Sequence, residues 1–169
     1  KDLRKMAISG ELFDKSSGER LYLNSKERRA FLEATYLEPI DIKYYCQLLY
    51  YTGCRLSEAL ELTPEKFDYS RLGVMIRTLK QGKDKNGNQI IRYRFNELPK
   101  NYIDDLGSYY GLFNEKKSKN QPKDKERIWQ FTDRSARTYV KQIMTKADIK
   151  GKRATARGLR HSMGVVLAL

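Results

Sequence analysis

Arg55 stands at a point of the chain that suits phosphate binding. It follows Gly53 and Cys54 at the end of one apolar helical run and precedes a second amphipathic run that starts at Leu56. Glycine readily takes the positive-φ conformation that closes a helix, so the sequence predicts a tight corner between two helices. A guanidinium held on such a corner can grip a phosphate through two parallel hydrogen bonds. Taken alone, an arginine at a helix start is most often a solvated surface residue.

Phosphodiester chemistry needs positive charge beside the phosphorus, because negative charge builds on the non-bridging oxygens during attack. A bound Mg²⁺ would need clustered carboxylates, and the adjacent pair Asp104 and Asp105 points in different directions on a helix. A zinc site is also disfavoured, because Cys46 and Cys54 are the only cysteines and the chain has one histidine. We therefore expect no metal and no cofactor, with arginines supplying the charge.

The composition favours a nucleic-acid partner. The 169 residues carry a formal net charge of +13, with 40% hydrophobic and 33% charged residues, which fits one soluble domain with a basic surface. No apolar run approaches the roughly 18 to 20 residues that span a bilayer, and no signal peptide opens the chain. We expect a cytoplasmic protein without a membrane partner. Charge alone does not separate DNA from RNA, or a binding module from an enzyme.

The elements that would position Arg55 follow from periodicity. Apolar residues at spacings of three and four predict a helix that begins at Asn24-Ser25 and a second that runs from Pro39 or Ile40 to Thr52. A third, short helix follows Arg55 and ends before Thr63-Pro64. Further helices are predicted after Pro99, after a cap at Asp133 and from about Leu159, with an extended segment at 128–131.

Between these helices the period changes from 3.6 to 2. Apolar residues alternate around 74–78 and again around 91–95, and Asn86-Gly87 between them is a dipeptide favoured in tight turns. The tip of the hairpin, which we expect at 80–85, carries three lysines. The predicted fold class is therefore mainly α with a small antiparallel β-hairpin or three-stranded sheet, an α+β domain.

Two sequence boxes resemble a known family. The stretch Leu49–Leu62, LYYTGCRLSEALEL, resembles the first arginine box of the tyrosine recombinases, the phage integrase family. Near the other end, Gly158-Leu159-Arg160-His161-Ser162 is similar to the family's second box, usually written HxLRH. The resemblance covers about Lys26 to Leu169 and implies the fold of that family's catalytic domain. We expect residues 1–24 to be a linker or entry segment and 25–169 to be the catalytic core, without its C-terminal part.

The resemblance implies roles for three residues of these boxes. Arg55 and Arg160 match the two arginines with which the family grips the scissile phosphate. Glu58 matches a carboxylate that the family places behind them, and one helical turn puts it on the same face as Arg55. The alternative for Glu58 is an ordinary charge on a helix surface.

A lysine on the hairpin is expected to protonate the leaving 5′ oxygen. Thr78-Leu79-Lys80-Gln81 looks most like the matching family segment, so Lys80 is the candidate general acid, with Lys83 as the alternative. Both could instead only track phosphates.

The second box departs from the family pattern at Arg157. The family usually has a histidine there, and arginine cannot act as a general base, so we expect Arg157 to donate a hydrogen bond to the phosphate. His161, the only histidine, is expected to have a supporting structural role, with direct catalysis as the alternative. Additional DNA contacts are expected from the hairpin and from the basic turn before the second box, at Lys83, Lys85, Lys152 and Arg153.

In the family, a tyrosine nucleophile lies some thirty residues beyond the second box. None of the 12 tyrosines here has a matching position, so we expect the chain to be unable to cleave DNA by itself. The resemblance implies that the whole protein, of bacterial, viral or mobile-element origin, forms a 3′-phosphotyrosyl link and acts as a tetramer on paired double-stranded DNA sites. The fragment alone is expected to be monomeric.

Three alternatives remain open at this point. A non-catalytic DNA-binding module would use the same arginines and lysines for phosphate contacts only. An enzyme resembling type IB topoisomerases would share the chemistry and relax supercoils without paired sites, although the TGCRLSEAL box favours a recombinase. An RNA-binding module is the weakest option, because the chain has no aromatic RNP-like strand motif and no KH loop.

Overall fold

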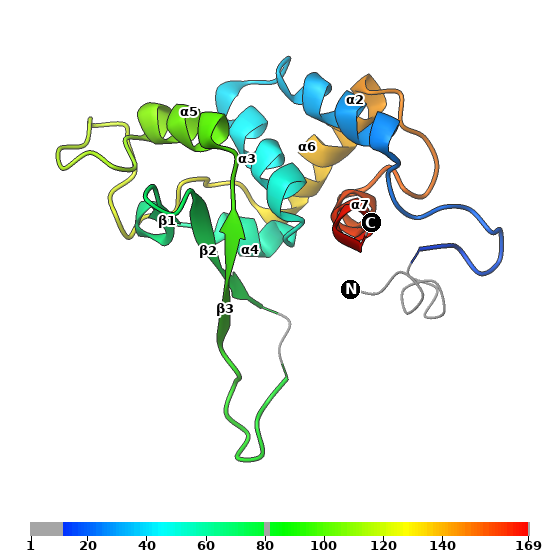
Figure 1. Cartoon of the computed structure of the whole chain (residues 1–169), viewed down its shortest axis with the longest axis horizontal. Coiled ribbons are helices and arrows are strands. Elements are labelled where there is room, and N and C mark those ends of the chain that lie inside the picture. Colours follow the sequence, from blue (N-terminus) through cyan, green and yellow to red (C-terminus); the bar gives the residue numbers. More distant parts are fainter. Residues whose placement is uncertain (1–11, 80–81, 169) are drawn as a thin grey trace. The chain divides into compact units, whose positions relative to one another are not determined.

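The computed structural model describes residues 12–79 and 82–168 (Figure 1). Its described part divides into two compact units. The first takes the chain up to Leu56 together with the part from Phe131 onward, and the second is Ser57–Gln130. Lys80, the predicted general acid, lies outside the described residues.

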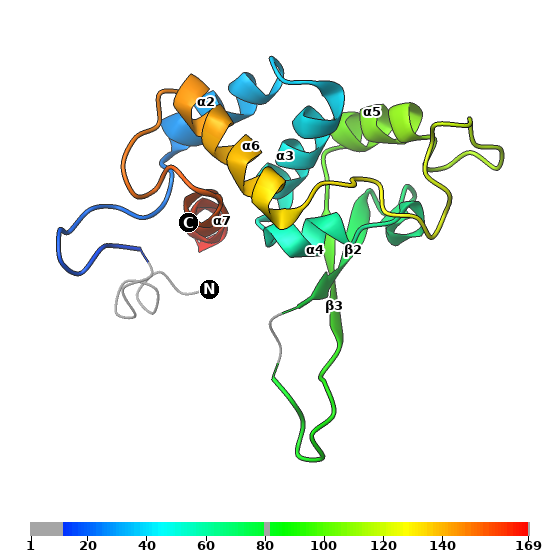
Figure 2. The same cartoon turned by 180° about the vertical axis from the view of Figure 1, so that it is seen from behind.

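The first unit is helical. The central helix α3 contacts α2, α6 and α7, and Figure 2 shows α7 beside α3 and α6. Its core contains fully buried side chains from each of these helices, among them Phe31, Tyr45, Val140, Ile143 and Leu159. The four helices are α2 (Ser25–Thr35), α3 (Ile40–Thr52), α6 (Asp133–Lys146) and α7 (Ala156–Ala168).

Local signals in the sequence account for several helix ends in this unit. Asn24 and Glu27 form a reciprocal capping box at the start of α2. Gly53 ends α3 in the left-handed conformation, with φ of 65°, as the sequence predicts. The predicted cap of α6 is wrong by one residue, because Thr132 is the N-cap and its side chain accepts a hydrogen bond from the Ser135 N–H.

The predicted start of α7 near Leu159 is also wrong, because the helix begins at Ala156. The Thr155 hydroxyl accepts a hydrogen bond from the Gly158 N–H at 3.1 Å, and the Thr155 carbonyl accepts one from the Leu159 N–H at 3.0 Å. Threonine therefore caps the helix three residues earlier than the apolar pattern indicates. Gly158 is required here, since a Cβ would lie 1.9 Å from the Arg153 carbonyl oxygen.

The second unit combines a small sheet with two helices. The sheet is antiparallel in the order β1-β2-β3, with Met75 paired to Phe95 and Thr78 paired to Arg92. Buried side chains from the sheet and helices form its core, including Ala59, Ile76, Ile103, Leu106 and Trp129. The elements are α4 (Leu56–Leu60), the 3₁₀ turn η1 (Pro64–Lys66), β1 (Phe67–Asp68), β2 (Gly73–Thr78), β3 (Arg92–Glu97) and α5 (Lys100–Tyr110). The predicted α+β class is confirmed.

The segment expected to be a strand or an extended anchor at 128–131 forms no strand. It is nevertheless fixed in the second unit, because the Ile128 N–H donates to the Leu62 carbonyl at 3.0 Å. Trp129 is buried and its Nε1–H donates to the Tyr110 hydroxyl at 2.9 Å. The polar partner explains how an indole can lie in this core.

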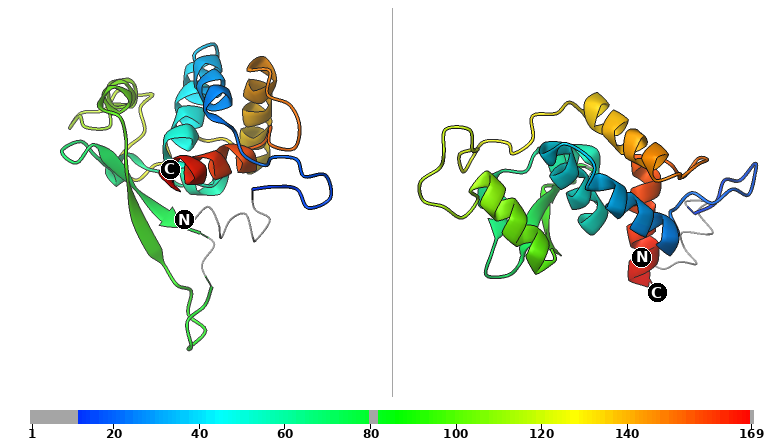
Figure 3. Two further views of the ribbon diagram at one scale, coloured as in Figure 1. Left: turned by 45° about the vertical axis from the view of Figure 1, so that its right-hand side comes forward. Right: turned by 90° about the horizontal axis from the view of Figure 1, so that it is seen from above.

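The β2–β3 hairpin continues beyond its paired strands as a long arm (Figure 3). Lys83 pairs with Gln89 through an isolated antiparallel bridge, and the turn at the tip contains Asn86 and Gly87, with the Gly87 φ at 78°. The Asp84 carboxylate accepts hydrogen bonds from the Asn86 and Asn88 N–H groups, each at 2.9 Å. The predicted Asn-Gly turn is confirmed, and it lies farther along the arm than the lysine-rich segment.

Candidate functional site

The corner that carries Arg55 is built from buried contacts on both sides. The Gly53 N–H donates to the Leu49 carbonyl at 2.9 Å and closes α3. The Tyr45 hydroxyl donates to the Leu56 carbonyl at 2.9 Å, which fixes the first residue of α4 against α3. Cys54 between them is buried, and Arg55 itself is half-buried. The predicted inter-helix corner is confirmed.

This corner packs directly on the helix that carries the second arginine. A Cβ on Gly53 would lie 2.8 Å from Met163 Cβ and 3.6 Å from the Arg160 carbonyl oxygen. Only a residue without a side chain allows the end of α3 to approach α7 so closely. The structure thus brings the backbone segments of Arg55 and Arg160, which lie 105 residues apart in the printed sequence, into one contact in the first unit.

The residues of the second box lie on different faces of α7. Leu159 and Ser162 are buried, Arg160 and His161 are half-buried, and Arg157 is exposed at the second position of the helix. Burial of Leu159 and Ser162 orients the helix, and their spacing leaves the basic side chains on its other faces. His161 Nδ1 is a buried atom, and the supporting role of His161 stays a prediction.

A cavity of about 530 Å³ lies beside Arg157 in the first unit. Arg137 and Lys141 from α6 line it together with Lys152 and the start of α7. Our sequence reasoning missed Arg137 and Lys141. The signal in the sequence was their spacing on one helix. Like charges four residues apart destabilise a helix by about 0.2–0.5 kcal/mol, so such a pair is not explained by helix stability.

Glu58 is an anchor of the hairpin in the second unit. Its side chain is 0% exposed and accepts hydrogen bonds from Arg94 Nη2 at 2.8 Å and from the Leu79 N–H at 3.1 Å. Arg94 Nη1 also donates to the Thr78 hydroxyl at 2.7 Å, so the network joins α4 to both strands at the point where the arm begins. The surface-charge alternative for Glu58 is wrong. Its support of Arg55 stays a prediction.

The structure describes only some of the lysines predicted to act on the arm. Lys80, the candidate general acid, lies outside the described residues. Lys83 and Lys85 are exposed on the arm and at the start of its turn. Their position suits contact with a large ligand, and their role in DNA binding stays a prediction.

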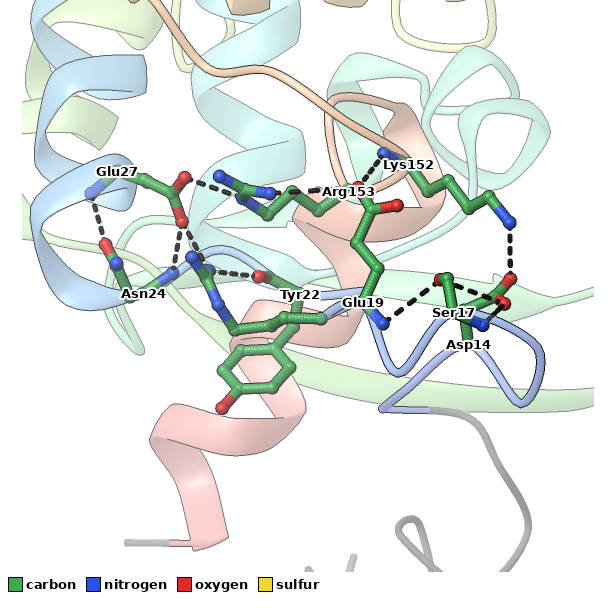
Figure 4. Close-up of polar contacts among 9 residues, drawn as sticks. Asp14, Ser17, Glu19, Tyr22, Asn24, Glu27, Lys152 and Arg153 are labelled. Carbon is green, nitrogen blue, oxygen red and sulfur yellow. Dashed lines mark hydrogen bonds and ion pairs between the residues drawn. The ribbon is translucent and has the colours of Figure 1, made fainter.

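Lys152 and Arg153 are paired with carboxylates of the chain's own entry segment and of α2, as Figure 4 shows. Lys152 Nζ lies 2.7 Å from Asp14 Oδ2, and its backbone N–H donates to Glu19 Oε1 at 2.7 Å. Arg153 Nε donates to Glu27 Oε2 at 2.7 Å. A DNA phosphate would therefore compete with these carboxylates, and the predicted DNA contacts of both residues remain untested.

Two carboxyl groups of this network have shifted pKa values. Hydrogen bonding from Lys152, then from Ser16 and Ser17, holds the pKa of Asp14 far below its usual range. Burial would raise the pKa of Glu27, but hydrogen bonds from Arg20, the Asn24 backbone and Arg153 outweigh it and lower that pKa. Both groups are therefore ionised at neutral pH, and the entry segment is tied to the turn before α7.

Neither a spanning helix nor a metal-binding cluster occurs among the described residues. None of the helices in 12–79 and 82–168 has the length and apolar character that crossing a bilayer requires. Within the same ranges, no three His, Cys, Asp or Glu side chains gather where they could hold a metal ion.

Comparisons with known proteins agree with this fold. The family model "Phage integrase family" matches residues 21–168, so the chain belongs to the phage integrase family, the tyrosine recombinases. No curated protein sequence matched the chain.

Solved tyrosine recombinases share the fold at low sequence identity. The XerA recombinase is 22% identical with a TM-score of 0.63, and covers 86% of this chain and 50% of its own. The XerH site-specific recombinase bound to its difH substrate is 18% identical with a TM-score of 0.62, covering 92% and 48%. The catalytic domain of bacteriophage HP1 integrase is 16% identical with a TM-score of 0.56, covering 88% and 72%. The chain spans about half the length of the two Xer proteins.

Proposed function

We propose that this chain is the catalytic core of a site-specific DNA recombinase that cleaves and rejoins strands through a 3′-phosphotyrosyl intermediate. The observation that carries the proposal is the contact between Gly53 and α7, which holds the backbone segments of Arg55 and Arg160 together. Two guanidiniums from one rigid unit can stabilise the negative charge that develops on a phosphate under attack. Duplex DNA is the substrate, and a tetramer on paired sites is the working form.

Each remaining group has one part in this reaction. Arg157 donates a hydrogen bond to the phosphate, because an arginine stays protonated and cannot take up a proton. Lys80 protonates the leaving 5′ oxygen, and Lys83 and Lys85 follow the DNA backbone. Glu58 orients the arginines and the root of the arm, and His161 supports α7. The covalent phosphotyrosyl link conserves the energy of the broken bond for resealing.

Support for a DNA substrate comes from charge as well as family. The net charge of +13 and the basic cavity beside Arg157 favour a polyanion. The XerH relatives were solved with DNA substrate, before and after cleavage. We place the protein in the cytoplasm, with the chromosome or a mobile element.

A suicide substrate tests this proposal directly. No tyrosine follows Arg160 in the 169 residues, so the experiment uses the natural full-length protein. That protein is incubated without metal with a nicked duplex carrying its recombination site. We expect a covalent protein–DNA adduct, abolished by Arg55→Ala and by Arg160→Ala. Tight binding without an adduct would show a DNA-binding module instead, and relaxation of supercoiled plasmids that lack the site would show a topoisomerase-like enzyme.

A further inference from the structure

Arg28 is a buried cation on α2. It is 8% exposed, and the neighbouring inward residues of the same helix, Phe31 and Ala34, are apolar. Within residues 12–79 and 82–168, no carboxylate forms an ion pair with it. A buried charge of this kind costs stability compared with an apolar side chain of similar size. Packing alone would therefore favour methionine or leucine, and the reason for an arginine has to lie in its contacts.

The guanidinium of Arg28 joins three helices. Nη1 donates to Ser162 Oγ on α7 at 2.9 Å, and Cζ lies 4.3 Å from the centre of the Tyr50 ring on α3. The Tyr50 ring also stacks on Phe31, with an interplanar angle of 8°. A desolvated cation over an aromatic face and a hydrogen bond from a charged donor are both attractive, and they offset part of the cost of burying the charge.

Both contacts are made to residues of the two arginine boxes. Tyr50 is three residues before Gly53, and Ser162 is two residues after Arg160. Ser162 donates its own hydroxyl proton to the Leu159 carbonyl, so its oxygen accepts from the guanidinium. The turn of α7 between Leu159 and Ser162 holds Arg160 and His161. Arg28 thus contacts the first box at the end of α3 and the turn of α7 that carries the second.

We propose that Arg28 is a positioning residue that fixes the rotation of α7, and with it Arg160, against the corner that carries Arg55. This inference rests on the proposed function, since it assumes that the two arginines act on one phosphate. Productive geometry must be held within about 0.5 Å, and a misplacement of about 1 Å can cost around 10²-fold in rate. The cation is retained because it places a catalytic group, although it adds little to stability.

The test measures the single-turnover rate of adduct formation at saturating nicked duplex, with DNA affinity measured in parallel. Arg28→Met keeps the length and apolar packing of the side chain and removes its donors. We expect a rate about 10- to 100-fold lower at unchanged affinity, because geometry is lost and phosphate contacts are not. Ser162→Ala should slow adduct formation less than Arg28→Met does. The double variant should be no slower than Arg28→Met, because the two changes remove the same hydrogen bond. Arg28→Lys should fall between wild type and Arg28→Met.

Two control variants separate positioning from folding and from charge. Gln47 donates to the Thr35 hydroxyl at 3.0 Å, a buried bond between α3 and α2 that does not involve α7. Gln47→Met should lower the melting temperature and leave the rate unchanged well below it. Arg29→Met removes one positive charge from the exposed face of α2 and should also cleave at the wild-type rate.

Two different results would overturn the inference. If Arg28→Met cleaves as fast as wild type, or slows only as much as Gln47→Met of equal melting temperature, Arg28 has a structural role alone. If the wild-type protein forms no adduct on its verified site, the proposed function fails and takes this inference with it. Adduct formation by the wild-type protein therefore shows whether the proposed function or only this inference has failed.

Discussion

The two regions expected to supply catalytic groups are built in opposite ways. In the first unit, Gly53 packs on α7, and buried contacts hold the corner of Arg55 against the helix that carries Arg160. In the second unit, the arm from residue 82 to 89 is exposed, and it is anchored at its root, where Glu58 binds Arg94 and Leu79. The comparison indicates that the corner between α3 and α4 is held rigidly, as the proposed phosphate grip would require, whereas the position of the arm is set mainly where it leaves the sheet.

The largest difference should appear between two lysines of the arm. Lys80→Ala should slow cleavage about 10²- to 10⁴-fold if Lys80 is the general acid, while Lys83→Ala should slow it only a few-fold through lost phosphate tracking. A substrate with sulfur at the 5′ bridging position should restore cleavage by Lys80→Ala, because a thiolate leaves without a proton. Single-turnover cleavage of both substrates checks this. If the sulfur-containing substrate restores cleavage by Lys83→Ala instead, the general acid is Lys83.

Two glycines sharpen the contrast between a packed corner and an exposed turn. Gly53→Ala adds a Cβ 2.8 Å from Met163 at a φ of 65°, and should lower the free energy of unfolding by about 2–4 kcal/mol. Gly87→Ala has a similar φ of 78° with nothing within 4 Å, and should cost about 1–2 kcal/mol. Urea denaturation measures both. Equal losses of unfolding free energy in the two variants would mean that α3 and α7 move apart enough to accommodate the added methyl group.

The anchor at the root of the arm can be compared with a neighbouring ion pair. Arg94→Met removes a partner of the fully buried Glu58 and should lower the free energy of unfolding by about 1–3 kcal/mol. Arg77→Met breaks a bidentate pair with Glu61 whose side chains are 32% and 39% exposed, and should cost less than about 1 kcal/mol. The same denaturation experiment tests them. A larger loss of unfolding free energy for Arg77→Met than for Arg94→Met would contradict the role of Glu58 as an anchor.

The smallest effect concerns pH and the entry segment of the first unit. The pKa of Glu27 is lowered in the folded chain from its ordinary 4.5, so its contribution to stability is present above that pH. That contribution is lost as the pH falls through the lower folded value. Glu27→Gln should therefore flatten the loss of stability seen below about pH 4.5, measured by chemical denaturation at a series of pH values. An identical pH profile in both proteins would refute the pairing.

Local signals predict the parts of this structure that are decided locally. The Asn24 capping box, the Gly53 corner and the Asn86-Gly87 turn each follow from a short stretch of sequence. The start of α7 was missed because a threonine cap was outweighed by the apolar pattern.

Contacts between distant residues could not be read in this way. The pairing of Lys152 with Asp14 spans 138 residues, and the bond from Arg28 to Ser162 spans 134. Lys152 and Arg153 looked like free DNA-binding cations for that reason. A net charge counts such residues without showing which carboxylates already neutralise them.

The measurement that tests the central claim most directly is a double-mutant cycle on Arg55 and Arg160. Single-turnover adduct formation is measured for wild type, Arg55→Ala, Arg160→Ala and the double variant, at saturating DNA and without metal. If both arginines stabilise one phosphate, each single change should cost about 10²- to 10³-fold, and the double variant should lose far less than the product. Single losses below about tenfold that multiply in the double variant would show two independent DNA contacts and contradict the account.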